Sequence, residues 1–138
     1  MTFKALSSSF SASTQLMEAD VALAAKAGFR TIVDNRPDGE EPGQPSAAEM
    51  QAYAASQGLA FVHIPVKVGA IGDADVSRMA AALAQSPSPV LGYCKSGTRA
   101  AMMWALAQAG KMPPEGLLTA ASDAGFDLRP IAARLAGK

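Results

Sequence analysis

The alternation of short apolar runs with helical segments constrains the fold of this chain more than any other feature. R-T-I-V-D (30–34), L-A-F-V-H-I-P-V (59–66) and V-L-G-Y (90–93) have the length and composition of buried strands, and a helical segment follows each of them. Consecutive β-α-β units of this kind build a mostly parallel sheet with helices on both faces. With a further short strand expected at 10–12, the sequence predicts a single α/β domain around a mostly parallel four-stranded sheet.

Capping residues place the helix boundaries. Ser46 and Glu49 form the S-x-x-E pattern of a capping box, which opens a helix that stops before Gly58. Asp73 can cap the next helix. The segment 100–110 is apolar on nearly every face, and such a helix is usually central and buried. We therefore expect helices at 17–27, 46–57, 73–85 and 100–110, then two short closing helices, the last capped by Asp127.

Length and charge exclude several classes of function. The 138 residues match the common size of one folding unit, so one domain is expected over 1–138. The formal net charge of zero argues against a broad surface for nucleic acid or an anionic membrane. No apolar run approaches the roughly 18 residues of a membrane span, and the first residues lack the pattern of a secretion signal. We therefore expect a cytoplasmic protein, whose oligomeric state the sequence does not specify.

Cys94 and His63 are the only cysteine and the only histidine of the chain. An internal disulfide is therefore excluded, and the Cys/His sets that bind structural zinc are absent. We expect neither a metal nor an organic cofactor. His63 lies inside a predicted strand, where a buried histidine with a backbone partner is the expected state.

Basic residues follow three of the predicted strands at the point where each strand ends. Arg36 follows the first, Lys67 the second and the segment 94–99 the third. Because the carboxyl ends of parallel strands lie along one edge of the sheet, where ligands bind in α/β folds, these segments should converge on one site. Arg36 either assists anion binding there or braces its own loop by pairing with Asp34 or Asp38.

The loop at 94–99 has the composition of an anion-binding turn. Ser96, Gly97 and Thr98 are small, so successive backbone N–H groups can point inward and form a nest. The helix that follows adds the positive end of its dipole, and Arg99 adds a planar cationic fork for two oxygens of an oxyanion. The sequence predicts that residues 95–98 and Arg99 bind a small anionic substrate.

Cys94 lies at the mouth of this loop. The helix terminus and the neighbouring cations would favour the thiolate and lower the pKa from about 8.5 into the range of roughly 3.5–7.5. A thiolate beside a bound oxyanion is placed to attack it and form a covalent thio-intermediate. The alternative is that Cys94 is a small buried side chain, a common state for a free cysteine. The strand, turn, arginine and helix around it favour the catalytic role.

Four further charged residues surround the predicted site. Lys95 either lies over the site or points outward, and Lys67 is expected to be solvated. Together with the two arginines they would form a positive pocket on a neutral protein. Glu40 and Glu41 belong to a Pro-rich loop and are expected to face water.

Three segments of the chain resemble the bacterial family of beta-lactamase hydrolase-like proteins, phosphatase-like domain. They are G-F-R-T-I-V-D-N-R-P-D-G-E-E-P (28–42), F-V-H-I-P-V (61–66) and Y-C-K-S-G-T-R (93–99), and the similarity covers roughly residues 8–112. The resemblance implies the fold of the dual-specificity protein phosphatases, with the cysteine loop between the last strand and the central helix. Some members of this family are labelled sulfur transferases.

The chain departs from the active phosphatases of that fold in three places. Four residues separate Cys94 from Arg99 where those enzymes have five. Tyr93 stands where they generally have His, and K-V-G-A-I-G (67–72) stands where they carry an acidic Asp. Without an acid, an alkoxide leaving group must depart unprotonated, which forfeits a factor of about 10² to 10⁴ in rate.

The loop C-K-S-G-T-R-A (94–100) is instead close in length and composition to that of the single-domain rhodaneses, which transfer sulfur through a cysteine persulfide. Sulfite and thiolate are weak bases and need no acid to leave. Asp73 and Asp75 come later in the sequence and are expected at the start of a helix and not in the role of that acid. The sequence therefore favours sulfur transfer from thiosulfate or a persulfide. Hydrolysis of phosphate esters is the alternative, and a non-catalytic module that binds an anion or a protein is a third possibility.

Overall fold

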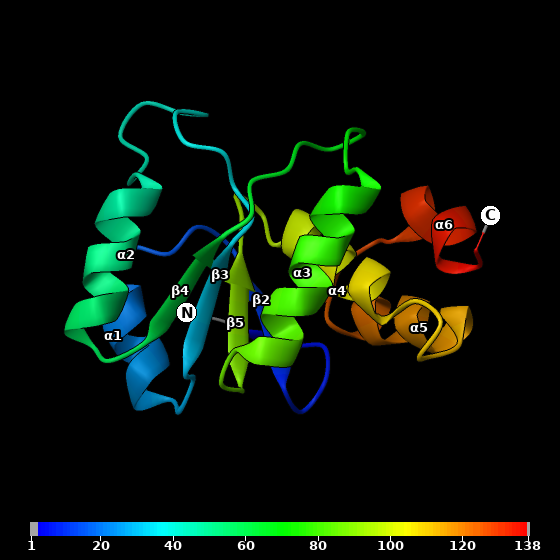
Figure 1. The fold of residues 1–138 in the computed structure, drawn as a ribbon, viewed down its shortest axis with the longest axis horizontal. Coiled ribbons are helices and arrows are strands. Elements are labelled where there is room, and N and C mark those ends of the chain that lie inside the picture. The colour runs from blue at the N-terminus through cyan, green and yellow to red at the C-terminus, as the bar shows by residue number, and fades with distance from the viewer. Residues whose placement is uncertain (1–2, 138) are drawn as a thin grey trace.

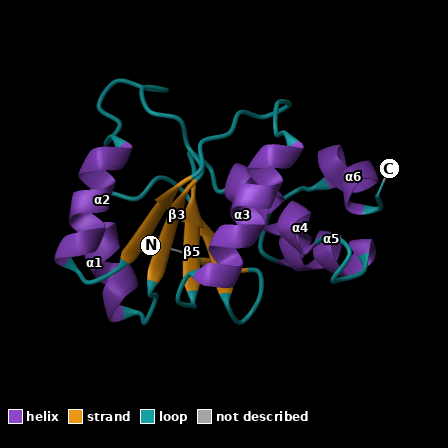
Figure 2. Cartoon of the chain, viewed as in Figure 1, coloured by secondary structure: helices purple, strands orange, loops and turns teal. Residues whose placement is uncertain are grey.

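The computed structural model describes residues 3–137 as one α/β unit (Figure 1). Its elements in chain order are β1 (Lys4–Ala5), β2 (Phe10–Ser13), α1 (Glu18–Lys26), β3 (Thr31–Asp34), α2 (Ala47–Ser56), β4 (Ala60–His63), α3 (Asp73–Gln85), β5 (Val90–Tyr93), α4 (Thr98–Gln108), α5 (Pro114–Asp123), η1 (Arg129–Ile131) and α6 (Ala132–Leu135). The sheet lies between α1 and α2 on one face and α3 and α4 on the other, with α5 and α6 beyond α4 (Figure 2). None of the helices within 3–137 has the length and apolar content needed to cross a bilayer.

The strand order in the sheet is β1-β2-β5-β3-β4. The pairs β2–β5, β5–β3 and β3–β4 are parallel, so the predicted parallel arrangement is confirmed. The predicted count of four strands is wrong by one, because β1 adds a short antiparallel edge to β2. Two exposed residues carry no period-2 pattern, and β1 forms through the tight turn in which the N–H of Leu6 donates to Phe10 O (2.9 Å).

Capping confirms the start of α2 and moves the start of α4. The N–H of Glu49 donates to Ser46 Oγ (3.1 Å), and the N–H of Ser46 donates to Glu49 Oε1 (2.9 Å), which is the predicted capping box. Helix α4 begins at Thr98, two residues before the predicted position. Gly97 is its N-cap with φ +94°, so the loop turns into the helix within fewer residues than expected.

Two predicted caps are placed differently by the structure. The N-cap of α3 is Gly72, whose N–H donates to Asp75 Oδ2 (3.0 Å), while Asp73 lies in the first turn. Asp75 takes the capping role because it stands three residues after the N-cap, the spacing at which a side chain reaches back to that N–H. Asp127 accepts from the N–H of Arg129 (3.0 Å) ahead of η1, and the N-cap of α6 is Ile131, so the prediction that Asp127 caps the last helix is wrong.

Helix α4 is central, as predicted, and nine of its eleven residues are buried. It packs closely on β5 because Gly92 has no side chain. A Cβ at Gly92 would lie 2.6 Å from Phe10 Cζ and 3.4 Å from the Cβ of Ala100. The Phe10 ring is stacked on Trp104, with 6.2 Å between the ring centroids. A second apolar core lies on the α1 and α2 face. The two cores hold the sheet rigid beneath the loops at its carboxyl edge.

Candidate active site

The carboxyl ends of β3, β4 and β5 meet at one edge of the sheet, where their loops converge (Figure 1). The loop after β5 is held by both neighbouring strands. The N–H of Cys94 donates to Ser13 O (3.4 Å), and the N–H of Gln15 donates to Lys95 O (3.3 Å). On the other side, the N–H of Asn35 donates to Tyr93 O (2.9 Å). Backbone hydrogen bonds alone therefore fix the position of the start of the cysteine loop.

The sulfur of Cys94 faces polar donors although the residue has 0% exposure. Its Sγ accepts a hydrogen bond from the N–H of Gly97 (3.1 Å). The hydrogen bonds that Arg99 donates to Glu40 raise the pKa of Arg99, and the Cys94 sulfur beside the guanidinium contributes further to that rise. Cys94 is thus buried, as expected for an inert thiol, and its sulfur also has the polar neighbours expected for a nucleophile.

The nest predicted over Ser96, Gly97 and Thr98 is partly closed within the loop. The N–H of Gly97 is used by the sulfur, and the N–H of Thr98 points to Ser96 Oγ (3.5 Å). Ser96 Oγ in turn donates to Thr98 Oγ1 (3.3 Å). Donors of the loop are therefore partly satisfied by its own atoms.

A cavity of about 560 Å³ opens over the loop. The residues that line it come from the loops after β3, β4 and β5 and from the start of α4, and they are Arg36, Glu40, Glu41, Lys67, Val68, Lys95, Ser96, Thr98 and Arg99. The predicted site residues therefore do converge, except that Cys94 and Gly97 lie below the lining. Cys94 has 0% exposure, so its sulfur is covered in this structure.

Arg99 is paired with a carboxylate from the loop after β3. Its Nη1 lies 2.8 Å from Glu40 Oε2, and its Nη2 lies 2.9 Å from Glu40 Oε1, a two-pronged contact. Nη1 also donates to Val66 O (3.0 Å), which ties the guanidinium to the segment after β4. Hydrogen bonds from Arg99, followed by those from Arg36, hold the pKa of Glu40 at about 2.

Arg36 is almost fully buried and braces its own loop, although through other partners than predicted. Its Nε donates to Glu40 Oε1 (2.8 Å), its Nη1 donates to Gln15 Oε1 (2.9 Å), and its Nη2 is paired with Glu41. Glu40 and Glu41 are exposed residues, as expected, but two guanidinium groups hold the carboxylate of Glu40. Glu41 is half-exposed and also lies 3.5 Å from Lys95 Nζ.

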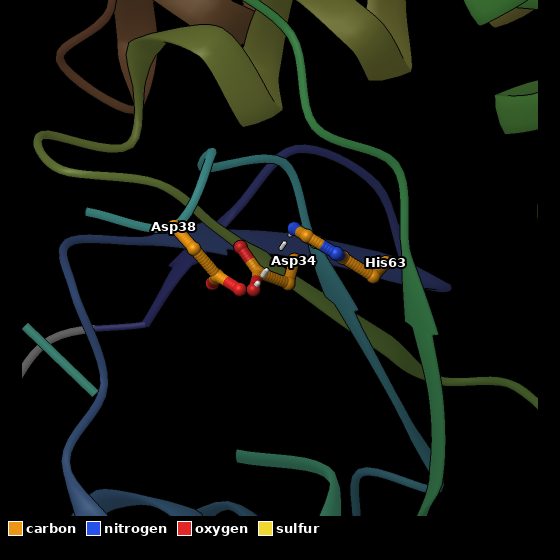
Figure 3. A group of neighbouring side chains, drawn as sticks. All are labelled: Asp34, Asp38 and His63. Atoms are coloured by element: carbon orange, nitrogen blue, oxygen red, sulfur yellow. Dashed lines mark ion pairs between the residues drawn. The ribbon is translucent and has the colours of Figure 1, made fainter. Parts of the chain in front are cut away.

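Asp34, Asp38 and His63 form a cluster beside the site, with one possible ligand atom of each within 4.8 Å of the others (Figure 3). His63 Nε2 lies 3.6 Å from Asp34 Oδ2 and 3.0 Å from Arg36 O, the backbone partner predicted for this histidine, which is half-buried and ends β4. Asp34 Oδ1 accepts from the N–H of Arg36, and Asp38 Oδ1 accepts from the N–H of Ala47. These bonds brace the loop that carries Glu40.

Tyr93, the residue before the cysteine, points away from the cavity. Its side chain belongs to the apolar core on the α1 and α2 face, and its hydroxyl has no hydrogen-bond partner among residues 3–137. Burial, followed by the charge of Asp34 on the next strand, raises the pKa of Tyr93. Tyr93 therefore takes no direct part in the chemistry at the cysteine loop.

Comparison with known proteins assigns this constellation to a family. The family described as Beta-lactamase hydrolase-like protein, phosphatase-like domain, matches residues 2–111. The chain belongs to this family. A Beta-lactamase hydrolase-like protein of Xylella fastidiosa (strain Temecula1 / ATCC 700964) is 42% identical over 106 residues, which are 75% of this chain and 25% of that protein. The chain thus spans about a quarter of the length of the curated relatives it matches.

Solved structures place the family within the phosphatase-like fold, as the sequence resemblance implied. A candidate phosphatase of Neisseria meningitidis Z2491 has a TM-score of 0.89 and 34% identity, and the match covers 99% of this chain and 98% of that chain. TpbA of P. aeruginosa, in complex with pTyr, has a TM-score of 0.61 and 18% identity over 96% of this chain and 88% of that chain. The second likeness concerns the fold alone.

Proposed function

We propose that this domain is a sulfurtransferase in which Cys94 carries the transferred sulfur as a persulfide. Three features support the proposal. The sulfur accepts the N–H of Gly97, which stabilises negative charge on it. The Cys94 sulfur contributes to the raised pKa of Arg99, so the two groups interact. The loop that presents both residues joins a buried strand to a buried helix, a rigid support for a nucleophile.

The state of the carboxyl groups at the cavity carries the proposal. Among residues 3–137, Glu40 and Glu41 are the carboxyl side chains of the lining. Arg99 holds the pKa of Glu40 at about 2, and Arg36 lowers the pKa of Glu41. Both are therefore ionised at neutral pH and have no proton to give to an alkoxide. Sulfite and thiolate leave as weak bases, so sulfur transfer proceeds without that proton.

The carboxyl groups that follow in the sequence are used elsewhere. Asp75 accepts the N–H of Gly72 and pairs with Arg78 at the start of α3. Asp73 lies 3.1 Å from Nη2 of Arg134, next to α6. Lys67 and Val68 line the cavity where phosphatases of this fold carry their acid. Segment 67–72 therefore contributes a lysine and a valine to the lining of the cavity, and no carboxyl group.

The transfer balances in two steps. The Cys94 thiolate attacks the outer sulfur of the donor, an Sγ–S bond forms, and the S–S bond of the donor breaks. The leaving sulfite or thiolate keeps the electron pair of that bond. An acceptor nucleophile then attacks the outer sulfur of the Cys94 persulfide, and the thiolate is restored. Neither step needs an external oxidant or reductant.

Hydrolysis of phosphate monoesters is the second candidate. The description of the Neisseria meningitidis structure and the phosphotyrosine complex of TpbA favour it. Cys94 would then attack phosphorus and form a phosphocysteine that water hydrolyses. The ionised carboxylates at the cavity weigh against this reaction with esters of poor leaving groups.

Intact mass spectrometry after exposure to each class of donor tests the proposal. We expect the mass of one sulfur atom to be added by an organic persulfide. Sulfate, whose sulfur is bonded only to oxygen and has no S–S bond to break, is the control and should add nothing. The variant Cys94→Ser should lose the added mass while keeping the circular dichroism spectrum of the parent, because the two side chains differ by one atom.

Other results would contradict the proposal. Sulfur loading that persists in Cys94→Ser would exclude the covalent route through this residue. Phosphate release from an aryl phosphate, with a phosphocysteine but no persulfide on Cys94, would establish the second candidate in its place.

A further inference from the structure

The two-pronged hydrogen-bonding position of the Arg99 guanidinium, called its fork below, is occupied by the carboxylate of Glu40. Glu40 meets Nη1 and Nη2 at 2.8 and 2.9 Å, the arrangement in which arginine binds two oxygens of an oxyanion. The remaining contact of Nη1 goes to Val66 O. An incoming oxyanion therefore finds the two-pronged position already taken by a carboxylate.

A second arginine makes this carboxylate difficult to displace. Arg36 Nε lies 2.8 Å from Glu40 Oε1, so one carboxylate is shared by two guanidinium groups. The side chains of Arg36 and Arg99 are 3% and 10% exposed, and departure of Glu40 would leave both cations poorly solvated and without this counter-charge. A poorly solvated charge that loses its partner is costly.

The backbone that carries Glu40 is also braced. The N–H of Glu40 donates to Gln44 Oε1 (3.1 Å), and Gln44 Nε2 donates to Pro37 O (2.9 Å). Asp38 accepts the N–H of Ala47 at the start of α2 (2.8 Å). The loop is therefore closed on itself and anchored to a helix. These bonds favour a fixed part of the site over a lid that swings away.

A fixed anion in the fork discriminates between donors by charge. A dianion such as thiosulfate or a phosphate monoester meets like charge and finds no free fork, and like charges in contact cost several kcal/mol. An organic persulfide with a neutral body carries at most one negative charge, on sulfur, and has no oxyanion head, so it needs no fork. The site can therefore accept the second donor and disfavour the first.

We propose that Glu40 is a specificity-determining residue, which fills the oxyanion position of Arg99 and so directs Cys94 to organic persulfides in preference to thiosulfate. This inference rests on the proposed sulfur transfer. Glu40 acts here by occupying the binding position and not by exchanging protons.

The test compares N-acetylcysteamine persulfide, which has an uncharged body, with thiosulfate as donors. The measured quantity is the ratio of their kcat/KM values. In Glu40→Gln we expect this ratio to fall at least about tenfold, because the thiosulfate rate rises when the like charge is removed. Glu41→Gln is the matched control. It removes the neighbouring carboxylate, which pairs with Arg36 and Lys95 but not with Arg99, and the ratio should change by less than about threefold.

Two further measurements keep the test decisive. If Glu40→Gln does not fold, Glu40→Asp retains the charge but withdraws it from the fork by one methylene, and a smaller fall of the ratio is expected. Calorimetric titration with sulfate measures the affinity of the Arg99 guanidinium for an oxyanion without catalysis. The variant Cys94→Ser/Glu40→Gln should bind sulfate at least about tenfold more tightly than Cys94→Ser.

The outcomes separate the two proposals. Persulfide loading of the parent with an unchanged ratio and unchanged sulfate affinity in the Glu40 variants would overturn this inference alone. An equal fall in Glu41→Gln would also overturn it, because the effect would then be one of general charge. Absence of loading from either donor in every protein would overturn the proposed function, and this inference with it.

Discussion

Gly97 is the residue whose lack of a side chain the cysteine loop most requires. Its φ of +94° lies in the region that favours glycine, and an added Cβ would lie 2.8 Å from Cε1 of Phe126. Phe126 belongs to the apolar core and cannot turn into solvent without opening it. The conformation also directs the N–H of Gly97 to the sulfur of Cys94.

We expect Gly97→Ala to destabilise the fold and to slow sulfur transfer. The positive φ costs about 1–2 kcal/mol for a residue with a Cβ, and overpacking adds about 1–3 kcal/mol. Urea unfolding measures the first effect and the rate of persulfide formation on Cys94 measures the second. Gly125→Ala is the matched control, because Gly125 also has φ +94° but an added Cβ there meets nothing within 4 Å. Equal losses of stability in the two variants would show that the contact with Phe126 has no effect.

The positions of some residues of the site could be predicted from the sequence, and those of others could not. Cys94 and Arg99 could be placed because they lie in one strand-turn-helix segment, whose geometry is local. The position of Glu40 could not be predicted, because its partner Arg99 is 59 residues away and the loop path between them is set by side-chain bonds of Gln44 and Asp38. Pairing across such a distance depends on the folded chain and leaves no local pattern.

At the scale of elements, the approach of α4 to β5 decides where the cysteine loop lies. Gly92 lets the helix and the Phe10 ring come close to the strand, and Phe10 is held by its stacking on Trp104. The alternation of strands and helices predicted this contact in outline. It could not predict β1, whose two residues join the sheet through a turn and not through an apolar pattern.

We expect Gly92→Ala to lower the free energy of unfolding by about 1–3 kcal/mol, because the new methyl group would meet Phe10 Cζ at 2.6 Å. The second substitution Phe10→Leu removes the ring atoms in contact. The double variant should therefore lose less stability than the sum of the two single variants, and a double-mutant cycle by urea unfolding measures the difference. Gly116→Ala serves as control, since nothing lies within 4 Å of its added Cβ in the first turn of α5 and alanine has a higher helix propensity than glycine. Strict additivity in the cycle would contradict the contact.

At the scale of the molecule, a chain of zero formal net charge concentrates opposite charges at one edge of its sheet. Glu40 joins Arg36, in its own loop, to Arg99, at the start of α4. Through Val66 O, Arg99 also holds the segment after β4. The same ion pairs that shape the site therefore connect three loops of the fold.

This network predicts how stability depends on acid. The pKa of Glu40 is lowered from 4.5 to about 2, first by the hydrogen bonds of Arg99. A carboxyl group whose pKa is lower in the folded state stabilises the fold fully above its unfolded pKa, and this contribution is lost as the pH falls through the folded value. The free energy of unfolding should therefore fall between about pH 4.5 and pH 2, and fall less steeply in Glu40→Gln. Urea unfolding across this pH range measures both slopes. Asp127→Asn is the control: hydrogen bonds from Arg129 lower the pKa of Asp127, but this pair is exposed and screened by water, so its removal should change the slope less than Glu40→Gln does. Parallel curves for the parent and Glu40→Gln would mean that the carboxylate shared by two arginines does not hold the loops together.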